Sequence, residues 1–483
     1  MTRLERVVAT VATLVAAVLV LTDAVPLLRG PAPYPPEWQW LRRGEAPDAM
    51  RFVWPLASAA LLTGLLALSG GRWFRDRPRR GAAVLLAGAT LVGAAFQLGL
   101  LGMEPQGALP TLLSRVISRT DTAYYTVAVS DDARAPLAWL DRHAELLLDL
   151  RKSAKHAATH PPGPVLYYRA WIATCEASPA LTRLVLSTAG LQPGDGPTRR
   201  PPHTPASIAG ALMGGLFLLA LCAAACGPIA VALRLLGRDA LGAARLAALW
   251  PLVPGAALMS PQLDQALALP VAGTVALLAI AMAAPTPRTG RLAALLAGSV
   301  GFLASFLSYG AVAFVAIGVV AIAWALGWKR APAPLAMASL AALFWLVLTV
   351  ALGHEPLAAA RAAIAFHRET YTAPRSYPLW LGFNPVDFAL FLGAPLVALG
   401  ALRLGRAPAG PPGRYRVALL AGLIVLVLSG TVRGELGRIG VPLMALALPA
   451  ALADRDLPAS DAAWMGSLQA ALCVVLRACW ILP

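Results

Sequence analysis

The sequence "ASIAGALMGGLFLLALCAAACGP" occupies residues 206–228 and contains no charged side chain. Because an α-helix rises about 1.5 Å per residue, this stretch is long enough to cross a hydrocarbon core of about 30 Å. Similar apolar runs recur along the 483-residue chain, which is 58% hydrophobic and only 13% charged, about half the charged share of ordinary soluble domains. The composition therefore predicts an all-α polytopic membrane protein.

The apolar runs predict about thirteen transmembrane helices. They lie at about 7–28, 52–70, 82–103, 206–228, 243–260, 265–284, 292–308, 310–327, 334–352, 386–402, 417–432, 439–453 and 464–482. The first run is too long for a cleavable signal peptide and further spans follow it, so we expect it to be retained. We divide the chain into two N-terminal helices (1–81), a helix with a long outer loop (82–205) and a C-terminal helical bundle (206–483).

The net charge of +16 is spread over short basic clusters rather than gathered on one face, which argues against nucleic acid as a partner. These clusters fall in every second connection between the apolar runs. The positive-inside rule places those connections, and the amino terminus, in the cytoplasm. The other connections, including the long one at about 105–205, are expected on the extracytoplasmic side. The abundance of Ala, Arg, Gly and Pro is typical of a GC-rich bacterial genome, so we expect the bacterial cytoplasmic (inner) membrane.

The predicted outer connections carry most of the polar chemistry. They include "PAPYPPEWQWLRRGEAPDAM" (31–50), "SRTDTAYYTVAVSDD" (118–132), "SPQLDQ" (260–265), "AAIAFHRETYTAPRSYPLWLGFNPVDF" (362–388) and "RGELGRIG" (433–440). Each stretch has an ordinary interpretation, because charged residues beside a span often mark its end and aromatic residues form interfacial belts. Together they predict a shared aqueous cavity, since an ionisable group near the bilayer is costly unless it faces water or a partner.

The stretch "KHAATHPPGPVLYYRAW" (155–171) lies inside the long outer loop. The segment 137–151 before it has helical apolar spacing, which predicts an amphipathic helix on the membrane surface. Because His160 precedes Pro161, the helical conformation is disfavoured at His160. We therefore expect that His156 and His160 do not lie on one helical face. This pair also lacks the Glu of a metalloprotease motif, so we predict no metal site and no cofactor, with a divalent cation left open.

Two of these patterns resemble the GT-C integral-membrane glycosyltransferases. "DTAYYTVA" (121–128) followed about forty residues later by "HPPGPVLYY" (160–168) is similar to the first outer loop of the branch that contains protein O-mannosyltransferases and aminoarabinose transferases. "SPQLDQ", "NPVDFALFLG" (384–393) and "GELGRIGVPLMAL" (434–446) also resemble stretches of bacterial membrane proteins assigned to that superfamily.

The resemblance implies transfer of a sugar from a polyprenyl-phosphate donor to a lipid, glycan or protein acceptor outside the membrane. Asp121 would activate the acceptor hydroxyl, and Tyr124 and Tyr125 would line its pocket. His160 would contact the donor phosphate where the family usually has Lys, and His156 is a further candidate for substrate binding. The acid that usually follows the first Asp is Thr122 here, so Asp131 and Asp132 compete with Asp121 as the base.

Elementary chemistry is compatible with that reaction. Displacing phosphate from an anomeric carbon needs a carboxylate that accepts the acceptor proton and cations that stabilise the leaving group. The outward arginines are candidates for the cations, and two acids could hold them or bind sugar hydroxyls: Arg368, Arg375, Arg433 and Arg438, with Asp264 and Glu435.

Three other functional classes stay open. A polymerase or ligase of surface polysaccharide would also have many spans and outward arginines. A transporter or lipid flippase would be expected to show internal repeats and ionisable groups within the spans, and neither is evident apart from Arg477. A scaffold without catalysis would tolerate replacement of Asp121 and His160 without loss of function.

Overall fold

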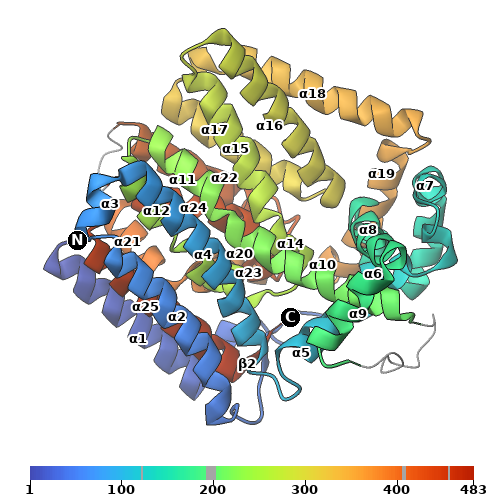
Figure 1. Ribbon diagram of the computed structural model, residues 1–483, viewed down its shortest axis with the longest axis horizontal. Helices are drawn as coiled ribbons and strands as arrows, with labels where there is room; N and C mark the ends of the chain where they lie inside the picture. The colour runs from blue at the N-terminus through green and yellow to red at the C-terminus, as the bar shows by residue number, and fades with distance from the viewer. Residues whose placement is uncertain (121–122, 192–202, 405–409, 455–456, 483) are drawn as a thin grey trace.

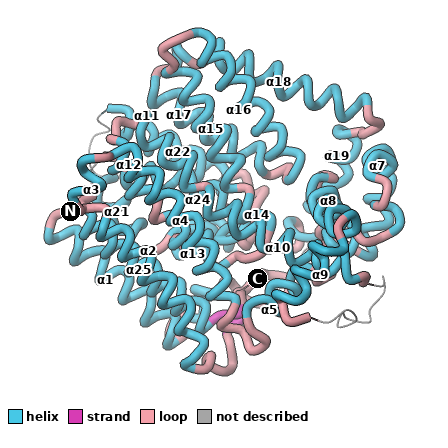
Figure 2. The backbone as a smooth tube through the Cα atoms, viewed as in Figure 1, coloured by secondary structure: helices cyan, strands magenta, loops and turns pink. Residues whose placement is uncertain are grey.

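The computed structural model describes residues 1–120, 123–191, 203–404, 410–454 and 457–482. Most of this is helix, as Figure 2 shows in cyan. Strands in the described ranges are limited to a short antiparallel pair, in which β1 (Leu41–Arg42) lies against β2 (Trp480–Ile481). The predicted all-α class is therefore confirmed.

Nine helices in the described residues are long and apolar enough to span a membrane. Several are composed of two consecutive segments. They are α1 (Arg3–Thr22), η2–α2 (Ala49–Phe52, Val53–Leu68), α4 (Pro78–Leu101), α10–α11 (Pro205–Ala224, Cys226–Leu235), α14–α15 (Leu263–Ala266, Ala268–Ala283), α16 (Pro287–Leu307), α18 (Pro332–Ala351), α22 (Gly410–Leu428) and α25 (Ala459–Cys479).

The other four predicted spans form shorter or bent helices. Three are shorter apolar helices: α12–η5 (Ala240–Ala247, Trp250–Leu252), α17 (Ala311–Leu326) and α24 (Val441–Leu452). The fourth is α20 (Tyr377–Leu392) with α21 (Ala394–Leu404), which are bent by 114° where Gly393 takes a φ of +101°. Twelve residues of helix extend about 18 Å, well short of a hydrocarbon core. The count of thirteen spans therefore stays a prediction.

Proline starts many of these helices. It occupies the first turn of α4, α10, α16 and α18. At this position the missing N–H has no intrahelical partner to lose, and the fixed φ suits the helix. The Pro content of the connections thus marks where spans begin.

The predicted cytoplasmic connections meet at one end of the bundle, beside the amino terminus and α3 (Arg72–Asp76) (Figure 1). The polar contacts that join distant connections there include Arg245 to Ser69 at 2.8 Å, the Met1 amino group to Asp461 at 2.6 Å, and Arg416 to Asp454. A 3₁₀ turn, η6 (Trp328–Arg330), carries the basic pair between α17 and α18. This grouping agrees with the alternation of the positive clusters along the sequence.

The predicted outer connections gather at the opposite end, around α5 and β2 (Figure 1). Polar contacts there join Arg43 to Glu104 at 2.7 Å, Arg115 to the Ser260 carbonyl at 2.8 Å, and Glu37 to the Ser376 amide at 2.8 Å. The helices at this end are η1 (Pro26–Arg29), α5 (Ala108–Val116), α6 (Tyr124–Ala128), η3 (Asp131–Ala133), α7 (Pro136–Ser153), η4 (Ala157–Thr159), α8 (Gly163–Ala177), α9 (Pro179–Thr188), α13 (Pro254–Leu258), α19 (Pro356–His367), the π-helical turn η7 (Arg368–Thr372) and α23 (Leu436–Ile439).

The N-terminal helices pack on the end of the chain. α1 contacts α21 and α25, and α2 contacts α4 and α25. Residues 1–81, the first of the three parts of the sequence division, therefore pack on the C-terminal bundle.

The amphipathic segment 137–151 lies within α7, whose apolar side faces protein. Leu147 packs with Ala158 and with Ala359 and Ala363 of α19. The sequence pattern suggested a helix resting on the membrane surface, and the structure instead gives this face a helix partner. Both interpretations require the same periodicity, so the sequence could not separate them.

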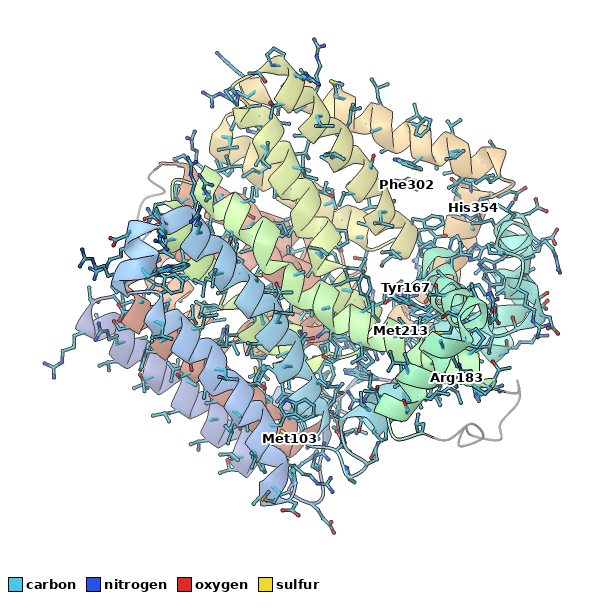
Figure 3. The ribbon with its side chains drawn as sticks, viewed as in Figure 1. Met103, Tyr167, Arg183, Met213, Phe302 and His354 are labelled. Atoms are coloured by element: carbon cyan, nitrogen blue, oxygen red, sulfur yellow. The ribbon has the colours of Figure 1, made fainter. Side chains whose placement is uncertain are left out.

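The Pro-Pro-Gly segment brings α8 against the end of α16. A Cβ atom on Gly163 would lie 2.2 Å from the backbone oxygen of Phe306, so a side chain does not fit there. One helical face of α8 then packs on α10, where the Tyr167 hydroxyl donates to the Gly214 carbonyl at 2.7 Å. Figure 3 shows Tyr167 beside Met213 of α10. The Pro-Pro block therefore fixes the long outer loop to the bundle.

Candidate functional site

Polar side chains from separate outer connections converge into one group, which we call the outer cluster. Its members come from α6, the η4 segment, α14, the end of α19 with η7 and the turn after it, and α23 with the residue before it. They are Tyr124, His156, His160, Asp264, His367, Tyr371, Arg375, Glu435 and Arg438. The sequence proposed all of these except His367 and Tyr371 as site residues.

The centre of the outer cluster is a carboxylate between two arginines. Glu435 Oε2 lies 2.7 Å from Arg438 Nη2, and its Oε1 lies 3.2 Å from Arg375 Nη2. Burial alone would raise the pKa of Glu435, but the two guanidinium groups outweigh it and hold that pKa below its ordinary value. Glu435 also takes a φ of +62°, a conformation that is costly for a residue with a side chain. The local fold thus keeps this carboxylate in place at some conformational cost.

Asp264 is the second carboxylate of the outer cluster. Its Oδ2 lies 3.7 Å from Arg438 Nε, and its side chain is 20% exposed, so solvent can reach it. Asp264 precedes Gln265, which belongs to a buried network of polar side chains. Gln265 donates to the Gln97 side-chain oxygen at 2.9 Å, and the Ser260 hydroxyl donates to the same oxygen. Because these buried groups bond one another, the turn before α14 is anchored in the bundle.

A carboxylate behind the outer cluster positions α23. Asp387 Oδ2 accepts the Gly437 amide at 2.7 Å, and Asp387 Oδ1 accepts from the Trp40 indole at 2.8 Å. A Cβ atom on Gly437 would lie 2.3 Å from the Phe391 ring. The Gly that precedes Arg438 therefore allows α23 to approach α20 closely.

His160 sits against Tyr124, with ring centroids 5.2 Å apart. His160 Nδ1 lies 2.9 Å from the His156 carbonyl oxygen, which can only accept, so Nδ1 carries a proton and Nε2 of the neutral ring is a base. Burial lowers the pKa of His160, Asp264 opposes that change and Arg438 adds to it. The backbone at His160 is extended (φ −121°, ψ 158°) after the η4 turn, which confirms that the two histidines do not share a helical face.

Tyr371 lies between the two other histidines. Its ring stacks on His156 with centroids 5.4 Å apart, and the His367 ring is 5.5 Å away. Burial lowers the pKa of His156 to about 3 and that of His367 to about 4. Both imidazoles are therefore neutral at neutral pH.

Tyr124 and Tyr125 point in different directions. Burial, reinforced by Asp264, raises the pKa of Tyr124, which faces the outer cluster. Tyr125 instead stacks on His203 with its hydroxyl 3.2 Å from His203 Nδ1. The structure therefore brings Tyr124 but not Tyr125 to the outer cluster, because successive residues of α6 project on different sides of the helix.

Two of the proposed arginines have other environments. Arg433 donates to the backbone oxygens of Arg375 and Thr372 at 2.8 and 3.3 Å and lies over the Tyr377 ring, so it braces the loop. Arg368 is exposed on η7. Neither is placed by the structure in the ion-pair network of Glu435.

The three proposed bases have different outcomes. Asp131 and Asp132 lie on the surface, with side chains 90% and 50% exposed, and pair with Arg134 and Arg142 at 3.3 and 3.4 Å. They are not brought to the outer cluster, so the structure does not support them as competitors. Asp121 lies outside the described residues.

Some residues of this region were missed because their role depends on tertiary packing. His367 and Tyr371 stood in the polar stretch 362–388, but nothing in their spacing indicated that they would meet His156. The first outer loop also supports the cluster, since Glu37 accepts from the Trp380 indole at 2.7 Å and Trp38 lies 5.8 Å from the Arg375 guanidinium carbon. The stretch 31–50 was marked in the sequence by its mixture of proline, tryptophan and charged residues, which did not indicate these particular contacts.

No group of three or more His, Cys, Asp and Glu side chains in the described ranges is arranged to hold a metal ion. Comparison of the sequence with protein-family models and curated proteins, and of the structure with solved structures, gave no match.

Proposed function

We propose that this protein transfers a sugar from a polyprenyl-phosphate-linked donor to a lipid, glycan or protein acceptor at the extracytoplasmic face of a bacterial cytoplasmic membrane. The activity would be that of an inverting GT-C-type glycosyltransferase. The observation that carries the proposal is the convergence of Tyr124 and His160, from the loop with the family-like motif, with Asp264 and Arg438 from two other family-like stretches. Motifs that are distant in the sequence thus meet in one polar cluster at the end of an apolar bundle.

The reaction assigns distinct tasks to these groups. An acceptor hydroxyl attacks the anomeric carbon, its proton passes to a carboxylate, and the bond from that carbon to the phosphate oxygen breaks. Asp121, three residues before Tyr124 in the sequence, is the proposed base. Arg438 and Arg375 would stabilise the negative charge on the departing phosphate, because guanidinium groups bind phosphate oxygens in a paired geometry.

The experiment that tests this proposal uses purified protein in lipid nanodiscs and radiolabelled polyprenyl-phosphate hexoses and pentoses. Release or transfer of sugar is measured for the wild type, for Asp121→Asn and for the surface control Asp131→Asn. We expect turnover with at least one donor, a loss of about 100-fold or more in Asp121→Asn, and no change in Asp131→Asn. Folded wild-type protein without turnover on any donor would contradict the proposal.

A transporter is a second candidate because of one observation, the 114° bend between α20 and α21. Broken helices of this kind often border substrate sites in transporters. Movement of an intact labelled polyprenyl-phosphate sugar between leaflets, without cleavage, would favour that candidate over the transferase.

A further inference from the structure

The outer cluster already holds carboxylates beside its guanidinium groups. The two guanidinium groups of Arg375 and Arg438 contact the two carboxylates of Glu435 and Asp264. An entering phosphodiester would add one more negative charge to a partly buried site in which Arg375 and Arg438 already pair with carboxylates. A buried charge without compensation is costly, so the site needs a further positive charge when it is occupied.

His160 is the group best placed to provide that charge. Its Nδ1–H is used on the His156 carbonyl, so its Nε2 is the ring atom that remains able to accept a proton. The titratable and charged groups around it come from five elements: Tyr124, His156, Asp264, His367 and Arg438. Tyr124 is a neutral phenol in this environment and His156 and His367 are neutral imidazoles. Asp264 favours a proton on His160, and Arg438 opposes it.

We propose that the outer cluster binds a phosphodiester together with one proton, which is taken up at Nε2 of His160. The protonated ring would then donate from Nδ1 to the His156 carbonyl and from Nε2 to a phosphate oxygen. The side chains of Asp264 and Arg438 in the same cluster are 20% and 13% exposed, so solvent reaches the edge of the outer cluster. The identity of the ligand rests on the proposed function, whereas the proton uptake does not require turnover.

The sign of the pH dependence follows from the charges. In the empty site, burial and Arg438 hold the pKa of His160 below its ordinary value of about 6.5. A phosphate charge within about 4–6 Å raises a neighbouring pKa by roughly 1–3 units. The gain in phosphodiester affinity that comes from protonated His160 is complete below the pKa of His160 in the empty site. This gain is lost as pH rises through the pKa of His160 in the occupied site. Between those two values the affinity should fall about tenfold per pH unit, as expected for one linked proton.

The test uses isothermal titration calorimetry on the full-length protein in nanodiscs of zwitterionic lipid. The probe is dibutyl phosphate, whose single negative charge does not change between pH 5 and 8. Titrations in two buffers with different ionisation enthalpies give the number of protons bound. We expect uptake of about one proton per ligand at the pH where affinity changes most steeply. His160→Gln should lose both the uptake and the pH slope, while Lys155→Gln, an exposed neighbour, should keep them.

Three results would overturn the inference: binding to the wild type without proton uptake, unchanged uptake in His160→Gln, or no binding of the probe at any pH. If His160→Gln does not fold, His160→Asn serves as the second variant, and the wild-type proton count stands as a test by itself. Proton-linked binding without sugar turnover would leave this inference in place and remove the proposed function. Turnover without proton uptake would do the reverse.

Discussion

Replacing Asp264 with asparagine should lower kcat/KM for the active donor by about 100-fold or more. The substitution keeps the shape of the side chain but removes the negative charge that faces Arg438 and supports a proton on His160. Charged groups aimed at reacting atoms in a partly water-excluded site are typically worth this much. Steady-state kinetics in nanodiscs, with the donor found active in the panel, give the measurement.

Asp132→Asn is the matched control for that variant, because it removes an acid from an exposed surface pair in the same outer region. Its kcat/KM should stay within about twofold of the wild type, in line with the small energies of exposed ion pairs. Equal kcat/KM values for Asp264→Asn and the wild type would show that the outer cluster is not the reacting site.

Replacing Glu435 with alanine should reduce the free energy of unfolding by about 3–5 kcal/mol. The change removes the carboxylate that pairs with both Arg375 and Arg438, whose side chains are only 10% and 13% exposed. Removing one partner of a buried ion pair carries a penalty of this size because the remaining charge is uncompensated. Denaturant titration in lipid micelles, followed by circular dichroism, measures it.

Glu369→Ala is the control for Glu435→Ala, since Glu369 is an exposed acid on the neighbouring turn η7. We expect a change within about 0.5 kcal/mol for this variant. Glu435→Gly adds a second comparison. Glycine would relieve the positive φ at residue 435 by roughly 1–2 kcal/mol, yet the loss of charge should still dominate. A glycine variant more stable than the wild type would contradict a structural role for the ion pairs.

The sequence predicted the spanning helices that depend on composition alone. Runs such as 206–228 are helical over almost their whole predicted length, because an apolar segment in lipid must satisfy its backbone internally. The sequence could not distinguish full spans from the short helix α24 or from the bent α20–α21 pair, since these helices are apolar too. Length within the bundle and the turn at Gly393 are set by packing against neighbouring helices.

The sequence could predict those members of the candidate site that are charged residues beside spans. It could not predict the members that helix packing brings to the site. Asp264, Glu435 and Arg438 stood out because ionisable groups beside spans need a reason to be there. Asp131 resembled a catalytic acid in the sequence, but an acid in a long loop is equally at home on the surface. His367 reaches the outer cluster through the packing of α19 on α7, a contact that sequence spacing does not encode.

The central claim is that the long outer loop and the ends of the bundle helices form one functional site. A double-mutant cycle of His160→Gln and Asp264→Asn, measured as kcat/KM for the active donor, tests it most directly. We predict that kcat/KM of the double variant is only slightly below that of the less active single variant. This corresponds to a coupling energy of about 1 kcal/mol or more. Losses that add within about 0.5 kcal/mol would show that the two side chains act independently and would contradict the claim.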